Sequence, residues 1–198
     1  MGAGPLALEG GRVLGLVGAP GFGLTRVGLS LLSATRGGPV AVVDVRGWLC
    51  PSAAWEVGIS PQRLVVVRCP DRIAWPRVVA ALLEGLPATY AEVPAGVKES
   101  DLRRLGALAR ARRSALVLRP LRGDLPTGVL HLRLEAGEVR WEGAGEGHGR
   151  LTRRSLVLQA SGKGVGGIER TWEVEDDGTD AVRVLSGLAS APAGRAVG

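Results

Sequence analysis

Several residue types that mark particular classes of protein are scarce in this sequence. Its 198 residues include only two cysteines, two histidines and two lysines. The isolated cysteines form neither a disulfide framework nor a metal-ligand pattern, so we expect Cys50 and Cys69 to be core thiols. The histidines, His131 and His148, are far apart in sequence, and the residues around them suggest neither a Ser/His/Asp triad nor a zinc site.

Long apolar runs are also missing. No run approaches the roughly 18 residues that a membrane-spanning helix requires, and the first residues lack the basic and apolar regions of a signal peptide. We therefore expect a cytoplasmic protein without a membrane partner. The length and the 45% hydrophobic content suit one domain with a substantial core. We assign residues 1–185 to this domain and predict that the small-residue tail 186–198 is disordered.

The charged residues are mostly arginine. The net charge is +6, and 25 residues are basic, of which only Lys98 and Lys163 are lysine. An excess of arginine, glycine and alanine is typical of a GC-rich genome, but a basic domain also suits nucleic acid or an acidic partner. The tryptophans are dispersed, which favours core or interface anchors over a base-stacking platform. They are Trp48, Trp55, Trp75, Trp141 and Trp172.

Apolar runs alternate with helical patterns in the first part of the chain. This alternation predicts a mainly parallel α/β sheet with helices on its faces. The expected strands are 12–17, 39–44, 63–68, 88–93 and 114–118, and the expected helices are 25–36, 51–58, 71–83 and 99–113. The later part alternates apolar with polar residues, which predicts antiparallel strands at 129–135, 138–142, 154–159 and 170–175.

A glycine-rich stretch, Gly18-Ala-Pro-Gly-Phe-Gly-Leu-Thr25, joins the first expected strand to the first expected helix. A phosphate-binding loop occupies this position in nucleotide-binding sheets, and its pattern is G-x-x-x-x-G-K-[ST]. Gly18, Gly23 and Thr25 fit this pattern, but Leu24 stands where the lysine should be. The loop therefore lacks the charge that reaches the β- and γ-phosphates. A turn that only packs strand against helix is the alternative interpretation.

The order of these segments resembles the core ATPase domain of the RecA recombinase family over roughly residues 8–176. The resemblance implies a RecA-like phosphate-loop core whose central sheet is followed by antiparallel strands. It depends on several short matches in order, not on any single motif. These are the lead-in Leu8-Glu-Gly-Gly-Arg-Val-Leu14, Val42-Val-Asp44, Cys50-Pro51, Val57-Gly58-Ile59, Leu64 to Asp71, and His131-Leu-Arg-Leu-Glu135.

The departures from that family concern catalysis. Arg46 stands where the resemblance implies the glutamate that activates water, and an arginine side chain cannot act as a base. Arg119-Pro120 replaces the Asn-Gln pair that senses the γ-phosphate, and Glu92 is the only acid near the expected magnesium-associated aspartate. With Leu24 in addition, these losses predict a pseudo-ATPase without a catalytic residue, metal or cofactor. Bound ATP with Mg²⁺, held by a vestigial site at Gly18, Gly21, Gly23 and Thr25, is the alternative.

Among RecA-like proteins that have lost catalysis, the chain resembles the ImuA-type accessory proteins, and its composition suits their actinobacterial branch. This resemblance implies a role in the SOS response and translesion mutagenesis. The expected partners are a Y-family polymerase homologue, an error-prone polymerase or RecA, with DNA as a further partner. A DNA-dependent ATPase completed by partner residues is the alternative. The candidate DNA or partner contacts, each of which could instead be a solvated surface residue, are Arg46, Arg122, Arg150, Arg153, Arg154 and Lys163.

Overall fold

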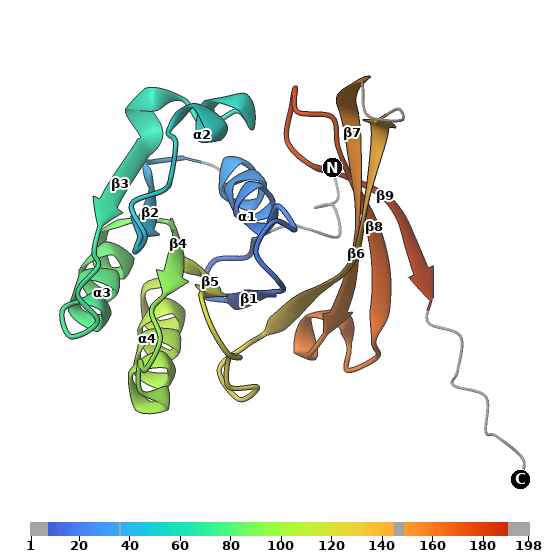
Figure 1. Cartoon of the computed structure of the whole chain (residues 1–198). Coiled ribbons are helices and arrows are strands. Elements are labelled where there is room, and N and C mark those ends of the chain that lie inside the picture. The colour runs from blue at the N-terminus through green and yellow to red at the C-terminus, as the bar shows by residue number, and fades with distance from the viewer. Residues whose placement is uncertain (1–7, 36, 145–148, 190–198) are drawn as a thin grey trace, which may run out of the picture.

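The computed structural model describes residues 8–35, 37–144 and 149–189, which form one mixed sheet with helices on both faces of its parallel part (Figure 1). The strand order is β3-β2-β4-β5-β1-β6-β7-β8-β9. The strands are β1 (Val13–Val17), β2 (Val40–Asp44), β3 (Leu64–Arg68), β4 (Ala88–Val93), β5 (Ala115–Pro120), β6 (Leu132–Ala144), β7 (Gly149–Ser161), β8 (Arg170–Asp176) and β9 (Arg183–Ala189). The helices are α1 (Leu24–Ser33), α2 (Ser52–Glu56), α3 (Trp75–Gly85) and α4 (Glu99–Arg112), with short 3₁₀ turns η1 (Pro61–Arg63) and η2 (Lys163–Val165).

The first five strands are parallel, as their continuous apolar runs predict. The crossovers from β1 to β2 and from β2 to β3 carry α1 and α2 and pack on one face. The crossovers from β3 to β4 and from β4 to β5 run in the opposite direction along the sheet and place α3 and α4 on the other face (Figure 1). Right-handed crossovers require this change of face when the direction reverses.

Two hydrophobic clusters follow from this arrangement. Leu16, Leu29 and Tyr90 belong to the cluster under α1, while Trp75 and Leu118 belong to the cluster under α3 and α4. Because successive strand residues point to opposite faces, the residues at the carboxyl ends of the strands are divided between the two faces in the same way. This alternation decides which polar side chains reach the α1 face.

The antiparallel part differs in detail from the sequence prediction. Residues 129–135 and 138–142 do not form two strands of a hairpin. Leu132–Ala144 is instead a single long strand that pairs in parallel with β1 on one side, at its start, and antiparallel with β7 on the other. A register shift against β7 between Ala136 and Val139 marks a bulge just after the segment that pairs with both neighbours. The predicted strands at 154–159 and 170–175 are confirmed within β7 and β8.

Strand β9 crosses the boundary at residue 185 that composition suggested for the disordered tail. It pairs antiparallel with β8 as far as Ala189, and residues 190–198 lie outside the described part of the chain. The structure thus confirms an α/β fold with a mainly parallel central sheet and antiparallel strands toward the C-terminus. Within the described residues, no helix has the length and apolar character needed to cross a membrane.

Candidate functional site

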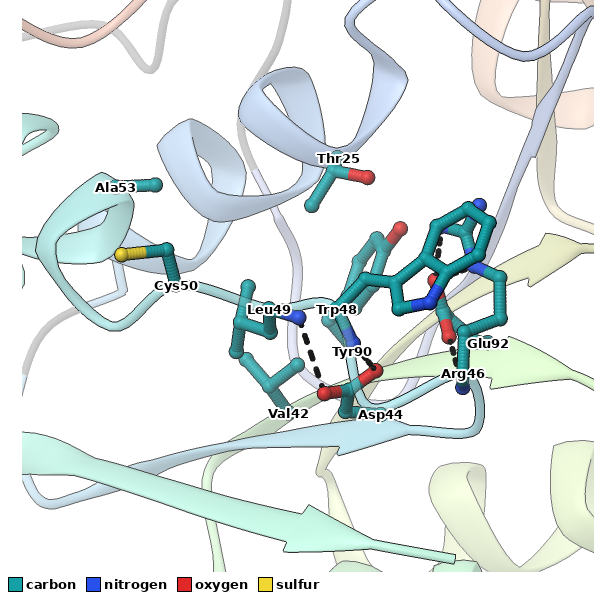
Figure 2. A pocket seen from close by; sticks show the side chains of 10 residues that line it. All are labelled: Thr25, Val42, Asp44, Arg46, Trp48, Leu49, Cys50, Ala53, Tyr90 and Glu92. Carbon is teal, nitrogen blue, oxygen red and sulfur yellow. Dashed lines mark hydrogen bonds and ion pairs between the residues drawn. The ribbon is translucent and has the colours of Figure 1, made fainter. Parts of the chain in front are cut away.

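A cavity of about 260 Å³ opens at the carboxyl ends of β2 and β4 (Figure 2). The connections that leave these neighbouring strands go to opposite faces of the sheet, and such switch points are where open α/β sheets bind ligands. The lining residues come from β2, β4, the start of α1 and the segment that leads into α2. They are Thr25, Val42, Asp44, Arg46, Trp48, Leu49, Cys50, Ala53, Tyr90 and Glu92.

Asp44, the last residue of β2, organises the wall of the cavity. Its carboxylate is 2% exposed and accepts hydrogen bonds from the backbone N–H groups of Gly47, Trp48 and Leu49 at 2.9, 3.2 and 3.1 Å. Three amide donors compensate the buried charge and fix the turn after the strand. The carboxylate therefore acts as a turn anchor within its own chain.

Glu92 and Arg46 form an ion pair across the cavity floor (Figure 2). One Glu92 oxygen accepts the backbone N–H groups of Val45 and Arg46 at 3.0 and 3.2 Å, and the other accepts both Nε, at 3.0 Å, and Nη2 of Arg46. The Glu92 side chain is 5% exposed, so its charge interacts with groups of the protein and hardly with solvent. The guanidinium also lies 4.7 Å from the centroid of the Trp48 ring. Arg46 thus binds a carboxylate of its own chain.

Thr25 and Tyr90 form the side of the cavity nearest α1 (Figure 2). The sheet holds Tyr90 against the helix so closely that a Cβ on Gly28 would lie 2.3 Å from Tyr90 Cε2. The phenol is buried, and burial raises its pKa above the ordinary value, an effect that the neighbouring Thr25 side chain partly offsets. The hydroxyl is therefore a neutral polar group.

The glycine-rich loop forms the tight strand-to-helix turn that its sequence predicts. Gly23, with φ 72°, precedes α1, whose N-terminus is capped by no side chain. Leu24 is 1% exposed and packs in the core under α1. At the position where the phosphate-loop pattern has lysine, the chain therefore has an apolar side chain that packs in the core.

Arg154 lies directly against this loop. A Cβ on Gly23 would come within 1.9 Å of its Nη1 atom and would displace the guanidinium, and the φ of 72° also favours glycine there. Its guanidinium forms an ion pair with Asp176, which also binds Arg26 at 2.8 Å, and lies over the Trp141 ring. Arg154 is only 8% exposed. The predicted DNA or partner contact is thus a buried tie between α1, β7 and β8.

Arg119 carries the most unusual charge near the loop. It points to the α1 face, because it lies two residues after Val117 of the α1-side cluster and pairs in register with Glu92. It is 5% exposed, and its Nε and Nη1 atoms have no hydrogen-bond partner in the described structure. A buried cation without a partner is unfavourable unless something compensates it.

The remaining candidate contacts are scattered. Arg122 follows β5, Arg150 begins β7, and both are exposed. Arg153 is close to Glu142 and Glu175, at 3.8 and 3.3 Å. Lys163 lies in η2, near the amino end of β1. These residues do not lie together at the cavity. Their positions depend on the order of the strands in the sheet, which the sequence alone does not give.

One sequence expectation about side chains, that both cysteines are core thiols, is corrected. Cys69 is buried as predicted, but Cys50 is exposed, because it lies in the segment before α2 and not in a strand. Its pKa is lowered chiefly by a hydrogen bond with Ser52, 3.1 Å away. Trp75 and Trp172 are buried anchors, whereas the other three tryptophans are at least half exposed: Trp48 at 76%, Trp55 at 50% and Trp141 at 50%.

The chemistry available at the cavity follows from the hydrogen bonds and ion pair that Asp44 and Glu92 form within the chain. Both carboxylates are occupied by donors of their own chain, and among the described residues that line the cavity only Thr25 and Tyr90 carry a hydroxyl. Among the described residues, no group of three or more His, Cys, Asp or Glu side chains could hold a metal ion.

The family model described as the MT3502 N-terminal domain matches residues 5–124 of the chain. The matched segment contains β1 to β5 and therefore both strands that flank the cavity. No curated protein gives a significant match to the chain.

Proposed function

The chain belongs to the MT3502 N-terminal domain family, and from the paired charges of its cavity we propose that it is a non-catalytic RecA-like accessory protein. The observation that carries this proposal is the engagement of Glu92 by Arg46 and by two backbone N–H groups. A carboxylate in this state is free neither to bind Mg²⁺ nor to accept a proton from water.

Two further features support the loss of catalysis. Leu24 is buried in the core, so no lysine charge reaches the loop. Arg46 neutralises the carboxylate of Glu92. Phosphoryl transfer depends almost entirely on positioning and on charge stabilisation. A site that has replaced its charges with internal pairs therefore retains the architecture without the activity.

Protein binding is the role that this proposal leaves, and exposed tryptophans at the cavity and on the neighbouring α2 offer a surface for it. Trp48, which stacks on Arg46, and Trp55 of α2 expose 76% and 50% of their surface. Exposed tryptophan beside arginine is typical of the energetic centres of protein interfaces. By its resemblance to ImuA-type proteins, we propose that the chain binds components of a damage-induced mutagenesis complex.

The loss of catalysis is tested by measuring ATP hydrolysis and binding of a fluorescent ATP analogue, with and without single-stranded DNA. We expect no turnover above background. The variant L24K/R46E restores both charges and serves as a comparison. DNA-stimulated turnover by the unaltered protein would overturn the proposal.

Partner binding is tested by capture from DNA-damaged cells and identification of the co-purifying proteins. We expect polymerase components or RecA to be captured and to be lost with W48A/W55A. The matched control is W141A, which removes a half-exposed tryptophan from β6 on another part of the surface. Equal capture by all three proteins would exclude the surface around Trp48 and Trp55 as the interface.

One observation favours a second candidate, an ATPase completed by partner residues. Arg119 offers unpaired N–H groups near the loop and could supply the cation that Leu24 lacks. In that case the captured complex hydrolyses ATP, and R119M abolishes this activity without preventing assembly. Absence of turnover in the assembled complex would eliminate this candidate.

A further inference from the structure

A second cavity, of about 420 Å³, lies at the opposite end of the parallel strands, beside the start of β1. We name it the amino-end cleft and define it by the basic residues Arg12, Arg110, His131 and Lys163, with glycines between them. Its volume is in the range of pockets that hold small ligands. It is separate from the cavity at the carboxyl ends of β2 and β4, with which it shares no lining residue.

Four separate segments bring the basic side chains together. Arg12 precedes β1, Arg110 lies in the last turn of α4, His131 precedes β6 and Lys163 lies in η2. The backbone fixes their positions, because the N–H of His131 donates to the carbonyl of Val13 at 2.8 Å and the N–H of Gly164 donates to the carbonyl of His131 at 2.8 Å. The convergence therefore depends on the tertiary fold, and no local motif encodes it.

The charges of the cleft are not balanced by acids. None of the described residues that line it is acidic. Arg110 and Lys163 form no ion pair within the described structure, and Arg12 has only the exposed Glu9, 3.5 Å away. Other arginines of α4 are paired, and these pairs are Arg103–Glu99, Arg104–Asp101 and Arg112–Glu84. The unpaired arginine of the helix is thus the one that faces the cleft.

The pKa of His131 reflects the same excess of positive charge in the cleft. Its pKa is lowered first by burial, then by the nearby cation Arg12, with a smaller contribution from Lys163, and only Glu9 acts in the opposite direction. A bound anion would compensate both cations and would favour the protonated imidazole.

We propose that the amino-end cleft binds a phosphate group, either of a nucleotide or of a single-stranded nucleic acid. Converging arginine and lysine donors suit a phosphate, since arginine offers a fork of N–H groups and lysine a point charge. Gly11, Gly128 and Gly162 line the wall, where the absence of side chains lets a ligand approach the backbone. This inference does not depend on the proposed accessory function, because the cleft lies at the other end of the sheet.

The test measures binding of AMP by calorimetry and of a labelled single-stranded oligonucleotide by fluorescence anisotropy, both at low salt. We expect R110Q/K163Q to weaken binding by about tenfold or more, which corresponds to about 1.4 kcal/mol. The matched control, R103Q/R104Q, removes two charges from the same helix but outside the cleft, and we expect it to change affinity less than about threefold. Thermal unfolding of each variant verifies that the fold is retained.

The two probes distinguish the sources of the phosphate. AMP binding that competes with the oligonucleotide identifies a nucleotide-sized site, whereas oligonucleotide binding alone identifies a backbone phosphate. In either case, the imidazole pKa of His131, followed by NMR, rises when the probe binds. Failure of both probes to bind, or equal weakening by the two double variants, would overturn the proposal.

Discussion

The two ends of the parallel strands balance their charges in different ways. At the carboxyl end, Asp44 and Glu92 are buried, and each is satisfied by donors of its own chain. At the amino end, Arg110 and Lys163 converge without an acid among the described residues that line the cleft. The first arrangement stabilises the folded chain by itself, while the second leaves cations free for a ligand.

This difference reverses what the sheet topology alone would suggest. Open α/β sheets bind ligands at the carboxyl ends of their strands, and the glycine-rich loop is at that end. Here the internal pairs have made that end part of the scaffold, and Arg119 is a buried cation there with two nitrogen atoms that no described residue hydrogen-bonds. The comparison predicts that substitutions at the carboxyl end change stability, whereas substitutions at the amino end change binding.

The largest effect is expected for Glu92→Ala. This substitution leaves the partly buried Arg46 without its carboxylate and removes the acceptor of two backbone N–H groups. Breaking a buried ion pair in this way costs about 3 kcal/mol. Urea denaturation should therefore show a clear loss in the free energy of unfolding.

Two controls define this effect. The double variant R46M/E92M replaces both charges by apolar side chains of similar length and should recover the part of the loss that comes from the unpaired guanidinium, while the backbone N–H groups of residues 45 and 46 remain without their acceptor. Glu138→Ala removes an acid from the exposed pair with Arg140 and should leave the urea midpoint unchanged. If Glu92→Ala unfolds at the same urea concentration as the unaltered protein, the pair does not stabilise the fold.

A smaller effect of opposite sign is expected for Arg119→Met. The native guanidinium is buried with two unpartnered nitrogen atoms, and an apolar side chain of similar length avoids that cost. We expect a gain of about 1 kcal/mol in the free energy of unfolding. Arg154→Met, which breaks the ion pair with Asp176, should instead destabilise the protein. A loss of stability in Arg119→Met would mean that the guanidinium is compensated within the fold.

The parallel half of the fold could be predicted because its signals are local. Continuous apolar runs mark β1 to β5, and the glycine-rich turn marks the start of α1. Strand β9 was missed because its sequence, Arg183-Val-Leu-Ser-Gly-Leu-Ala189, is rich in small residues, and its pairing with β8 overrides this weak propensity. The single strand β6 was divided in two for a similar reason, since its bulge interrupts the alternation.

The candidate site was harder to predict because its contacts are distant in sequence. The resemblance drew attention to Arg46 and Glu92 separately, but their pairing depends on β2 lying next to β4. The amino-end cleft requires the positions of four segments at once, which periodicity does not encode. Burial of Arg119 at the end of β5 and exposure of Cys50 before α2 likewise depend on what packs above each of them.

The smallest effect concerns pH and the amino end. Burial and Arg12 lower the pKa of His131, so just below the ordinary histidine pKa of about 6.5 the unfolded chain binds more protons than the folded one. Stability therefore falls as the pH decreases from 8 toward 5, and His131→Gln removes this contribution. His148 is present in both proteins and cancels in the comparison.

Urea midpoints of the two proteins between pH 5 and 8 measure this difference, which should be a fraction of the loss expected for Glu92→Ala. Inorganic phosphate at matched ionic strength should reduce the slope of the unaltered protein, because an anion in the cleft favours the charged imidazole. The R110Q/K163Q variant should lose this response to phosphate. Identical pH dependence in the unaltered protein and His131→Gln would contradict an unbalanced positive charge at the amino end and would remove the contrast between the two ends of the sheet.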